Sequence, residues 1–360
     1  MACYILKEER GMDKDKLKNN KWLVSAYEAV MAPIHNLSYI VKKKSMCFIA
    51  SIKKSEILSY GEKNADKTFV ILSPFSKCGI YSSILLNLPY IECIKRSGYY
   101  PIMDFQNYYS PMMQDEEKKG IENAWTYYYK QIGDYQLEDV YQSKNVILEW
   151  NRLKRIKIPE WNKMLPMNKK ELMRWNKVVR DNIHLTDVLR EQIQEHKKQI
   201  FQDKRVLGIG IRAGYRAAML RKHPIIEGHP QVPDCEEMIQ IVEARMKEWN
   251  YNYLFVSCDD REYLNKFKEY FRGNCLYIDR PLLHYFDNDQ PNIELSDLQQ
   301  VELRNITIRQ RQNDYIKEVY LLAQCDSLYC CIGGGYQFAY ILNGGKYKHF
   351  ESYNEGLIHL

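Results

Sequence analysis

Short apolar segments alternate with helical segments along most of this chain, and this order is the strongest constraint on its fold. Residues 69–72 form an apolar, strand-like run, residues 80–96 have the spacing of a helix, and residues 100–104 form the next strand-like run. A strand, a helix and a second strand in so short a stretch predict a crossover between parallel strands. The sequence therefore indicates an α/β protein.

The same order recurs through the rest of the chain. Further strands are expected at 146–148, 206–211, 253–257, 275–278 and 327–332. Further helices are expected at 234–249, 261–271 and 312–324, with another opening at the glycines 333–335 and a long helix or helix pair at 168–202. Two successive series of α/β units predict two Rossmann-like, doubly wound domains that face each other across a cleft.

The length of 360 residues exceeds what one hydrophobic core usually supports. We expect a lysine-rich helical segment at residues 1–67, packed on the first domain. Residues 68–200 are expected to form an amino-terminal α/β domain with a bridging helix, and residues 201–360 a carboxyl-terminal α/β domain.

The net charge indicates the class of ligand, and the cysteine pattern bears on metal binding and on the cellular compartment. The net charge of +6 suits a small anionic ligand and is too low to predict nucleic-acid binding. The ten cysteines show neither a Cys-x-x-Cys pair nor zinc-site spacing, so we expect no metal and no cofactor. With no signal peptide and no apolar run near the ~20 residues of a membrane span, we expect a cytoplasmic protein, with peripheral membrane contact as the minor alternative.

Residues 205–216 combine an apolar strand, small residues and arginines. Gly208 and Gly210 alternate with apolar residues and would let a ligand approach the backbone closely. Arg212 and Arg216 follow the strand, and the planar guanidinium group suits a phosphate. A buried strand ending in two solvated arginines explains this segment equally well.

Three features follow predicted strands of the second domain: Arg212, the pair Asp259–Asp260, and the glycines Gly333, Gly334 and Gly335. If the strands are parallel, all three lie along one edge of the sheet. A glycine-rich turn opens a helix whose amide groups can bind an anion, an arginine can neutralise a diphosphate, and an aspartate can accept hydrogen bonds from a nucleoside. A nucleoside diphosphate would therefore explain all three.

Each candidate residue also has a structural alternative. Asp259 and Asp260 could be helix caps, and the glycines 333–335 could serve close packing. His229 could be an ordinary loop histidine. Asp104, at the end of a predicted strand in the first domain, is either a ligand-binding residue or the cap of a turn, and it is our only candidate there for the general base.

A dinucleotide fingerprint at residues 208–214 is the competing motif, and we reject it on three grounds. No helix is expected directly after Gly214, Asp234 has the position of a helix cap, and the isoleucines alternate with the glycines as in a continuing strand. A nucleotide-sugar epimerase or dehydrogenase is disfavoured for the same reason.

Several segments resemble the fucosyltransferase superfamily, most closely the bacterial surface-polysaccharide enzymes related to nodulation and core α-1,6-fucosyltransferases. The resemblance rests on the order of Val206–Arg212, Gly228-His229-Pro230, Phe255–Asp260 and Leu321–Leu328 with the glycine turn. Segments 101–107, 122–129 and 343–347 are also similar to those enzymes.

The resemblance implies a GT-B architecture and metal-independent, inverting transfer of fucose or a related sugar from a GDP-sugar. The acceptor would be a glycan or lipid-linked glycan of bacterial surface polysaccharide. By position, Arg212 corresponds to the arginine that binds the β-phosphate and stabilises the leaving group. His229 and Asp260 correspond to positions that contact the ribose end of the nucleotide.

The chain departs from this family pattern at three places. Gly210 stands where relatives have a histidine, Tyr215 stands where they have an aspartate, and Gly333–Gly334 replaces paired serines. Arg216 is the candidate to replace part of the missing polar network. The alternative function is a non-catalytic relative that binds a nucleotide or a glycan.

Overall fold

The computed structural model describes residues 56–75, 78–108, 110, 113, 115–148, 159, 165–220, 228–282 and 306–359, all within one compact unit. Most of the predicted amino-terminal helical segment lies outside these residues. Its last part, residues 56–67, contains no helix, and Leu58 pairs antiparallel with Val146 beside the first sheet. The helical prediction is therefore wrong for residues 56–67, while the predicted domain boundaries stay a prediction.

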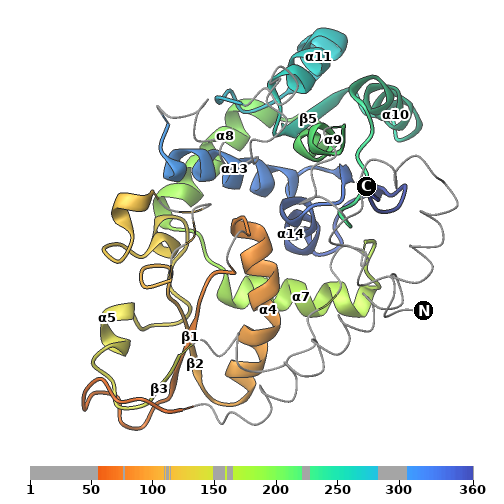
Figure 1. Cartoon of the computed structure of the whole chain (residues 1–360). Coiled ribbons are helices and arrows are strands. Elements are labelled where there is room, and N and C mark those ends of the chain that lie inside the picture. The colour runs from red at the N-terminus through yellow and green to blue at the C-terminus, as the bar shows by residue number, and fades with distance from the viewer. Residues whose placement is uncertain are drawn as a thin grey trace, which may run out of the picture. The chain divides into compact units, whose positions relative to one another are not determined.

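The first sheet has three parallel strands in the order β2-β1-β3 (Figure 1). The strands are β1 (Phe69–Leu72), β2 (Tyr100–Met103) and β3 (Val146–Ile147). Helix α4 (Ile80–Arg96) connects β1 to β2 as the predicted crossover and contains Pro89. The short helix α5 (Leu137–Val140), which sequence analysis missed, contributes Leu137 and Val140 to a cluster with β1.

The second sheet has five parallel strands in the order β6-β5-β4-β7-β8. The strands are β4 (Val206–Ile211), β5 (Tyr253–Cys258), β6 (Cys275–Leu276), β7 (Ser327–Cys331) and β8 (Phe350–Tyr353). Strand β8 was not predicted, because it is an edge strand with only half-buried residues. Two parallel sheets with crossover helices confirm the α/β class.

The remaining helices follow the predicted rhythm with one exception. They are α7 (Lys169–Asn182), α8 (Asp187–Phe201), α9 (Ala213–Leu220), α10 (Cys235–Glu248), α11 (Arg261–Phe271), α13 (Ile308–Leu322) and α14 (Gly334–Asn343).

Helix α9 begins directly after Arg212, so the expectation that no helix opens there is wrong. The second ground against a dinucleotide fingerprint is confirmed, because the Asp234 carboxylate caps α10 by accepting from the Glu237 amide at 2.8 Å.

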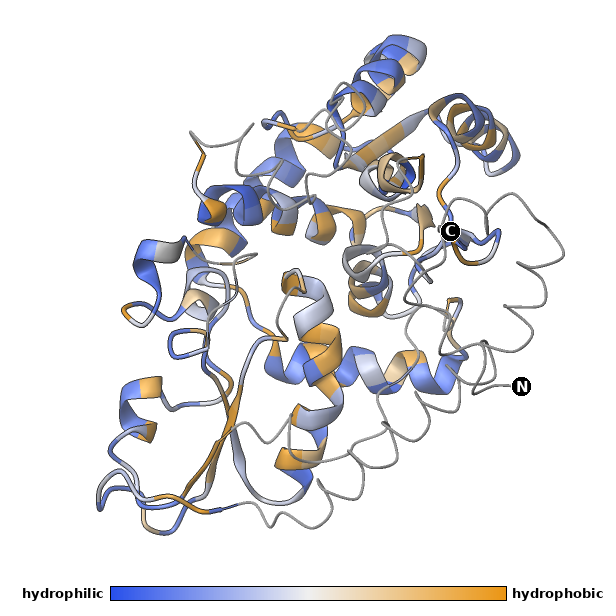
Figure 2. Ribbon diagram, in the orientation of Figure 1, coloured by the Kyte–Doolittle hydropathy of each residue, from blue (hydrophilic) through white to orange (hydrophobic). Residues whose placement is uncertain are grey.

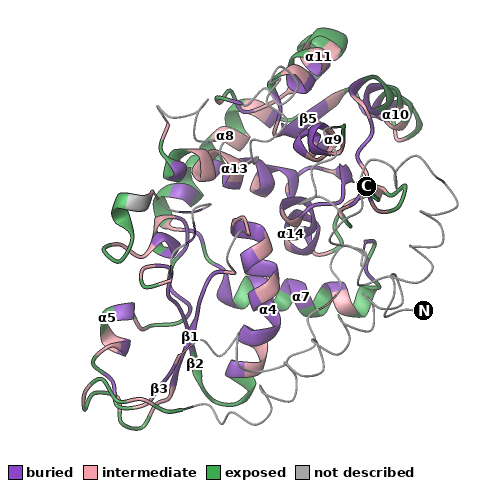
Figure 3. Cartoon of the chain, viewed as in Figure 1, coloured by how far each residue is buried: buried purple, intermediate pink, exposed green. Residues whose placement is uncertain are grey.

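Both faces of β4 are buried, as expected for a central parallel strand. One face contributes Val206 to the cluster formed with α13 and α14, and the other contributes Leu207, Ile209 and Ile211 to the cluster formed with α10 and α11. Figure 2 shows hydrophobic residues along β1 and β5, and Figure 3 shows these strands buried. Helix α14 packs against both α4 and α7, so the first cluster continues into the first half of the chain.

The glycines of β4 make room for side chains of other elements. A β-carbon built on Gly208 would lie 3.0 Å from Leu322 and 3.2 Å from the Cys325 sulfur, and one on Gly210 would lie 2.8 Å from the Tyr336 ring. The Tyr336 hydroxyl donates to the Ile211 carbonyl at 2.7 Å and to the Ser257 carbonyl at 3.2 Å. These glycines therefore serve close packing, and the space in which we expected a ligand is filled by protein.

Within the described residues, no helix is both long enough and apolar enough to cross a membrane.

The replacement Gly210→Ala tests this packing. We expect it to lower the free energy of unfolding by about 1–3 kcal/mol, because the new methyl group meets the rigid Tyr336 ring and the Cys330 β-carbon. Urea denaturation measures the change. Gly273→Ala is the matched control, since no heavy atom lies within 4 Å of its β-carbon position. Equal stability of the two variants would contradict the packing role.

Candidate functional site

Three predicted site segments meet at one edge of the second sheet. Strand β4 lies between β5 and β7, with Ile211 beside Cys258 and Gly210 beside Cys330. Because all three strands run in the same direction, the residues that follow them emerge together. The structure thus brings together Arg212, the segment 259–260 and the segment 333–335, as predicted.

Arg212 has a specific ion pair and an otherwise open guanidinium group. One terminal nitrogen lies 3.0 Å from a carboxylate oxygen of Asp259, and the two side chains are 27% and 17% exposed. Its aliphatic stem rests on Gly333, where a β-carbon would lie 3.2 Å from Arg212 Cγ. The contact with Asp259 is an ion pair, and among the described residues no side chain accepts a hydrogen bond from this guanidinium. The remaining N–H groups can therefore bind an anion.

Asp259 connects Arg212 to the start of α9. Its second carboxylate oxygen accepts from the Gly214 amide at 3.3 Å. Burial acts to lower the pKa of Arg212, but Asp259 together with the hydroxyls of Tyr215, Tyr315 and Tyr336 outweighs this effect, and the pKa lies well above its ordinary value. Arg212 is therefore a fixed positive charge, held in place by Asp259.

Tyr215 links Arg212 to His229. The Arg212 guanidinium lies over the Tyr215 ring, 4.8 Å from its centroid, which is a cation–π geometry. On the same tyrosine, the His229 ring packs edge-on with centroids 5.0 Å apart. His229 Nδ1 is buried and has no hydrogen-bond partner within the described residues. His229 thus lies near the predicted site through Tyr215, and its contact with a nucleotide stays a prediction.

Arg216 makes no described contact with this ion pair. Its one described hydrogen bond is a long one, 3.5 Å, to the Val232 carbonyl, and its Nε is buried without a partner among the described residues. Its predicted part in nucleotide binding stays a prediction.

The glycine turn brings two helix starts together. Gly333 precedes α14 and Gly79 precedes α4, and neither helix has a side-chain cap at this end. A β-carbon on Gly334 would lie 2.8 Å from the Ser82 hydroxyl and 3.2 Å from the Ser82 amide nitrogen, so the first turns of the two helices are in contact. Uncapped helix starts present free amide donors and partial positive charge.

The adjacent aspartates have different roles. The fully buried Asp260 carboxylate accepts from the Tyr263 amide at 3.0 Å and caps α11. The helix-cap interpretation is therefore confirmed for Asp260, whereas Asp259 does not cap α11 but accepts from the Gly214 amide in the first turn of α9. A ribose contact by the Asp260 carboxylate, which the family resemblance implied, does not fit a buried cap.

Asp104 is not placed to act as a general base. It is fully buried, and four groups donate to its carboxylate: the amides of Gln106 (3.0 Å) and Asn107 (2.9 Å), the Asn107 side chain (2.8 Å) and the Tyr141 hydroxyl (2.8 Å). These bonds hold the turn after β2. The turn-cap interpretation is confirmed, and our choice of Asp104 as a catalytic residue is wrong.

Sequence analysis missed a buried ion pair behind the site. Arg280 donates to Glu318 of α13 at 2.6 and 3.0 Å and to the Cys258 carbonyl at 3.0 Å, while the Ser257 hydroxyl donates to Glu318 at 2.9 Å. Burial raises the pKa of Glu318, against the effect of Arg280. The pair anchors α13 to the end of β5. Its members are far apart in the sequence and match no local motif.

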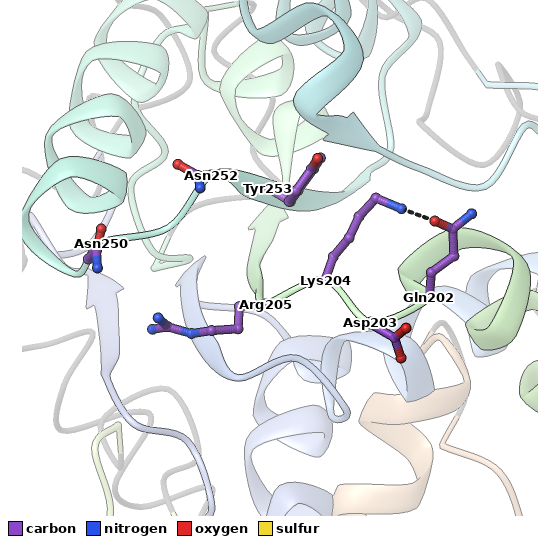
Figure 4. A pocket seen from close by; sticks show the side chains of 7 residues that line it. All are labelled: Gln202, Asp203, Lys204, Arg205, Asn250, Asn252 and Tyr253. Carbon is purple, nitrogen blue, oxygen red and sulfur yellow. Dashed lines mark hydrogen bonds between the residues drawn. The ribbon is translucent and has the colours of Figure 1, made fainter.

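A surface hollow of about 530 Å³ lies at the opposite edge of the same sheet (Figure 4). It is lined by Gln202, Asp203, Lys204, Arg205, Asn250, Asn252 and Tyr253. Both cations there already have aromatic partners, because Lys204 lies over Tyr253 at 5.4 Å and Arg205 over Tyr251 at 5.1 Å. Open α/β sheets bind ligands at the carboxyl ends of their strands, so we place the candidate site at Arg212.

In the part of the chain that the structure describes, no group of three or more His, Cys, Asp or Glu side chains could hold a metal ion. Metal independence itself stays a prediction.

Comparison with solved structures finds fucosyltransferases of similar chain path. One is fucosyltransferase NodZ from Bradyrhizobium, with a TM-score of 0.42 and 13% identity over 73% of this chain and 88% of that chain. Another is NodZ alpha-1,6-fucosyltransferase co-crystallized with GDP, with a TM-score of 0.45 and 12% identity over 76% and 91% of the two chains. A third is POFUT1 in complex with GDP-fucose, with a TM-score of 0.44 and 7% identity over 81% and 99%. No protein-family profile and no curated protein matches the chain.

The replacement Asp104→Asn tests the structural role of this aspartate. We expect the free energy of unfolding to fall by about 1–3 kcal/mol, because a buried acceptor of four hydrogen bonds loses its charge and one oxygen. Urea denaturation gives the value. Unchanged stability, together with a loss of transferase rate of about 10²-fold or more, would restore Asp104 as a general base.

The replacement Asp259→Asn tests the charge balance at Arg212. Removing the carboxylate charge 3.0 Å from the guanidinium should tighten the binding of inorganic pyrophosphate several-fold, because one repulsion is lost and Arg212 is freed. Isothermal titration calorimetry measures the affinity. Weaker binding would mean that orientation of Arg212 by Asp259 matters more than its charge.

Proposed function

We propose that this chain is a glycosyltransferase that moves fucose, or a related sugar, from a GDP-sugar to a glycan acceptor. The observation that carries the proposal is the open guanidinium of Arg212 at the carboxyl edge of the five-stranded parallel sheet, next to the uncapped start of α14. The choice of fucose as the sugar and of GDP as the nucleotide rests on the sequence resemblance of this segment to fucosyltransferases. A role in bacterial surface polysaccharide synthesis rests on the same resemblance.

The chemistry required of Arg212 follows from the reaction. When the bond between the sugar and the diphosphate breaks, negative charge develops on the leaving phosphate. A fixed cation close to that oxygen stabilises the transition state more than the ground state. Arg212 remains charged at any relevant pH, and Gly333, Tyr215 and Asp259 restrict its orientation. Amide groups at the starts of α14 and α4 are suited to bind the other phosphate oxygens.

A non-catalytic nucleotide-binding protein is the second candidate, and the surroundings of Asp104 favour it. The nominated base is fully buried and accepts four hydrogen bonds. Calorimetry with GDP, GDP-fucose and UDP-sugars, followed by transfer assays with varied acceptors, separates the two. Binding with turnover supports the enzyme, binding without turnover supports the second candidate, and no binding of any nucleotide sugar contradicts both.

The replacement Arg212→Ala tests the phosphate role. We expect the transfer rate to fall by about 10²–10³-fold, because charge stabilisation of the leaving group is lost. Arg212→Lys keeps the charge without the planar fork and should show an intermediate loss.

Arg190→Ala is the control, since this exposed arginine of α8 forms a surface ion pair with Asp187 and no other within the described part of the chain. The far-ultraviolet circular dichroism spectrum should be unchanged in all three variants. A wild-type rate in Arg212→Ala would refute the role.

A further inference from the structure

Tyr315 of α13, which sequence analysis did not single out, lies where three helices meet at the candidate site. A β-carbon on Gly335 would clash with the Tyr315 hydroxyl oxygen, so this hydroxyl rests against the first turn of α14. Tyr81, in the first turn of α4, packs edge-on against the Tyr315 ring with centroids 5.4 Å apart. Only glycine at position 335 allows the hydroxyl to come this close.

The first turn of α14 and its preceding Gly333 contact both Tyr315 of α13 and Arg212, which follows β4. Gly333 supports the stem of Arg212, and Gly335, two residues further, supports the hydroxyl of Tyr315. Burial raises the pKa of Tyr315 to about 12, while the nearby positive charge of Arg212 acts to lower it. The hydroxyl is therefore protonated near neutral pH and can donate a hydrogen bond.

No hydrogen bond of this hydroxyl is found among the described residues. The neighbouring Tyr336 differs, because its hydroxyl donates to the Ile211 and Ser257 carbonyls. A neutral hydroxyl next to a guanidinium is suited to a phosphate group. Both groups can donate hydrogen bonds to the phosphate oxygens, and the guanidinium also supplies a positive charge.

We propose that the Tyr315 hydroxyl donates a hydrogen bond to the phosphate that Arg212 binds, which is the terminal phosphate of the nucleoside diphosphate. This inference rests on the proposed function. It makes Tyr315 a residue that distinguishes a diphosphate from a monophosphate.

The matched variants Tyr315→Phe and Tyr320→Phe test the inference with the full-length protein. Both remove one hydroxyl from α13, and the buried hydroxyl of Tyr320 has no hydrogen-bond partner among the described residues. The affinities for GDP and GMP are measured by calorimetry. We expect Tyr315→Phe to weaken GDP binding by about 10-fold, the effect of one hydrogen bond to a charged group, and to leave GMP binding unchanged. Tyr320→Phe should bind both nucleotides as the wild type does.

Three results would overturn the inference: unchanged GDP affinity in Tyr315→Phe, an equal loss for GDP and GMP, or an equal loss in Tyr320→Phe. The Arg212→Ala variant distinguishes a wrong role for Tyr315 from a wrong proposed function. If Arg212→Ala loses GDP affinity and Tyr315→Phe does not, only the role of Tyr315 is wrong. If the wild-type protein does not bind GDP, the proposed function fails as well.

Discussion

The contact between Gly210 and the Tyr336 ring is the constraint on which the candidate site depends. The ring occupies the space that a side chain at position 210 would need, and its hydroxyl donates to carbonyls near the ends of two neighbouring strands, those of Ile211 and Ser257. Helix α14 is thereby held against the ends of β4 and β5. The positions of Arg212 and of the glycine turn both follow from this one packing arrangement.

Two positions at which the sequence departs from the fucosyltransferase pattern that it resembles have clear roles in the structure. Gly210 stands in place of a histidine of that pattern, and the Tyr336 ring fills the space beside it. Tyr215 stands in place of an aspartate and supplies an aromatic face for Arg212, while Asp259 supplies a carboxylate from the end of β5. Arg212 thus has an orienting partner at position 215 and a counter-charge from Asp259, which lies at a different position from the aspartate of that pattern.

Features that depend on local sequence were predictable, and those that depend on distant partners were not. Apolar periodicity located β1, β2, β4, β5 and β7, because a buried parallel strand must be apolar on both faces. The convergence of Arg212, Asp259 and Gly333 followed from strand direction alone. The part played by each side chain did not, since a strand-end aspartate looks the same in sequence whether it caps a helix, as Asp260 does, or pairs with an arginine, as Asp259 does. Helix α9 was missed because its first turn, Ala213–Arg216, reads as a continuation of a glycine-rich loop.

Helix α13 makes contacts on several sides, and this restricts how its sequence can change. Its first amide, that of Ile308, donates to Asp115 in the first half of the chain, Tyr315 rests on Gly335, and Glu318 holds Arg280. Each residue of an α-helix advances the rotation by about 100°. A single inserted or deleted residue between 308 and 315 would therefore turn one set of contacts away from its partners while leaving the other in place. The length of this helix is thus fixed by geometry, even though many of its exposed side chains can be exchanged.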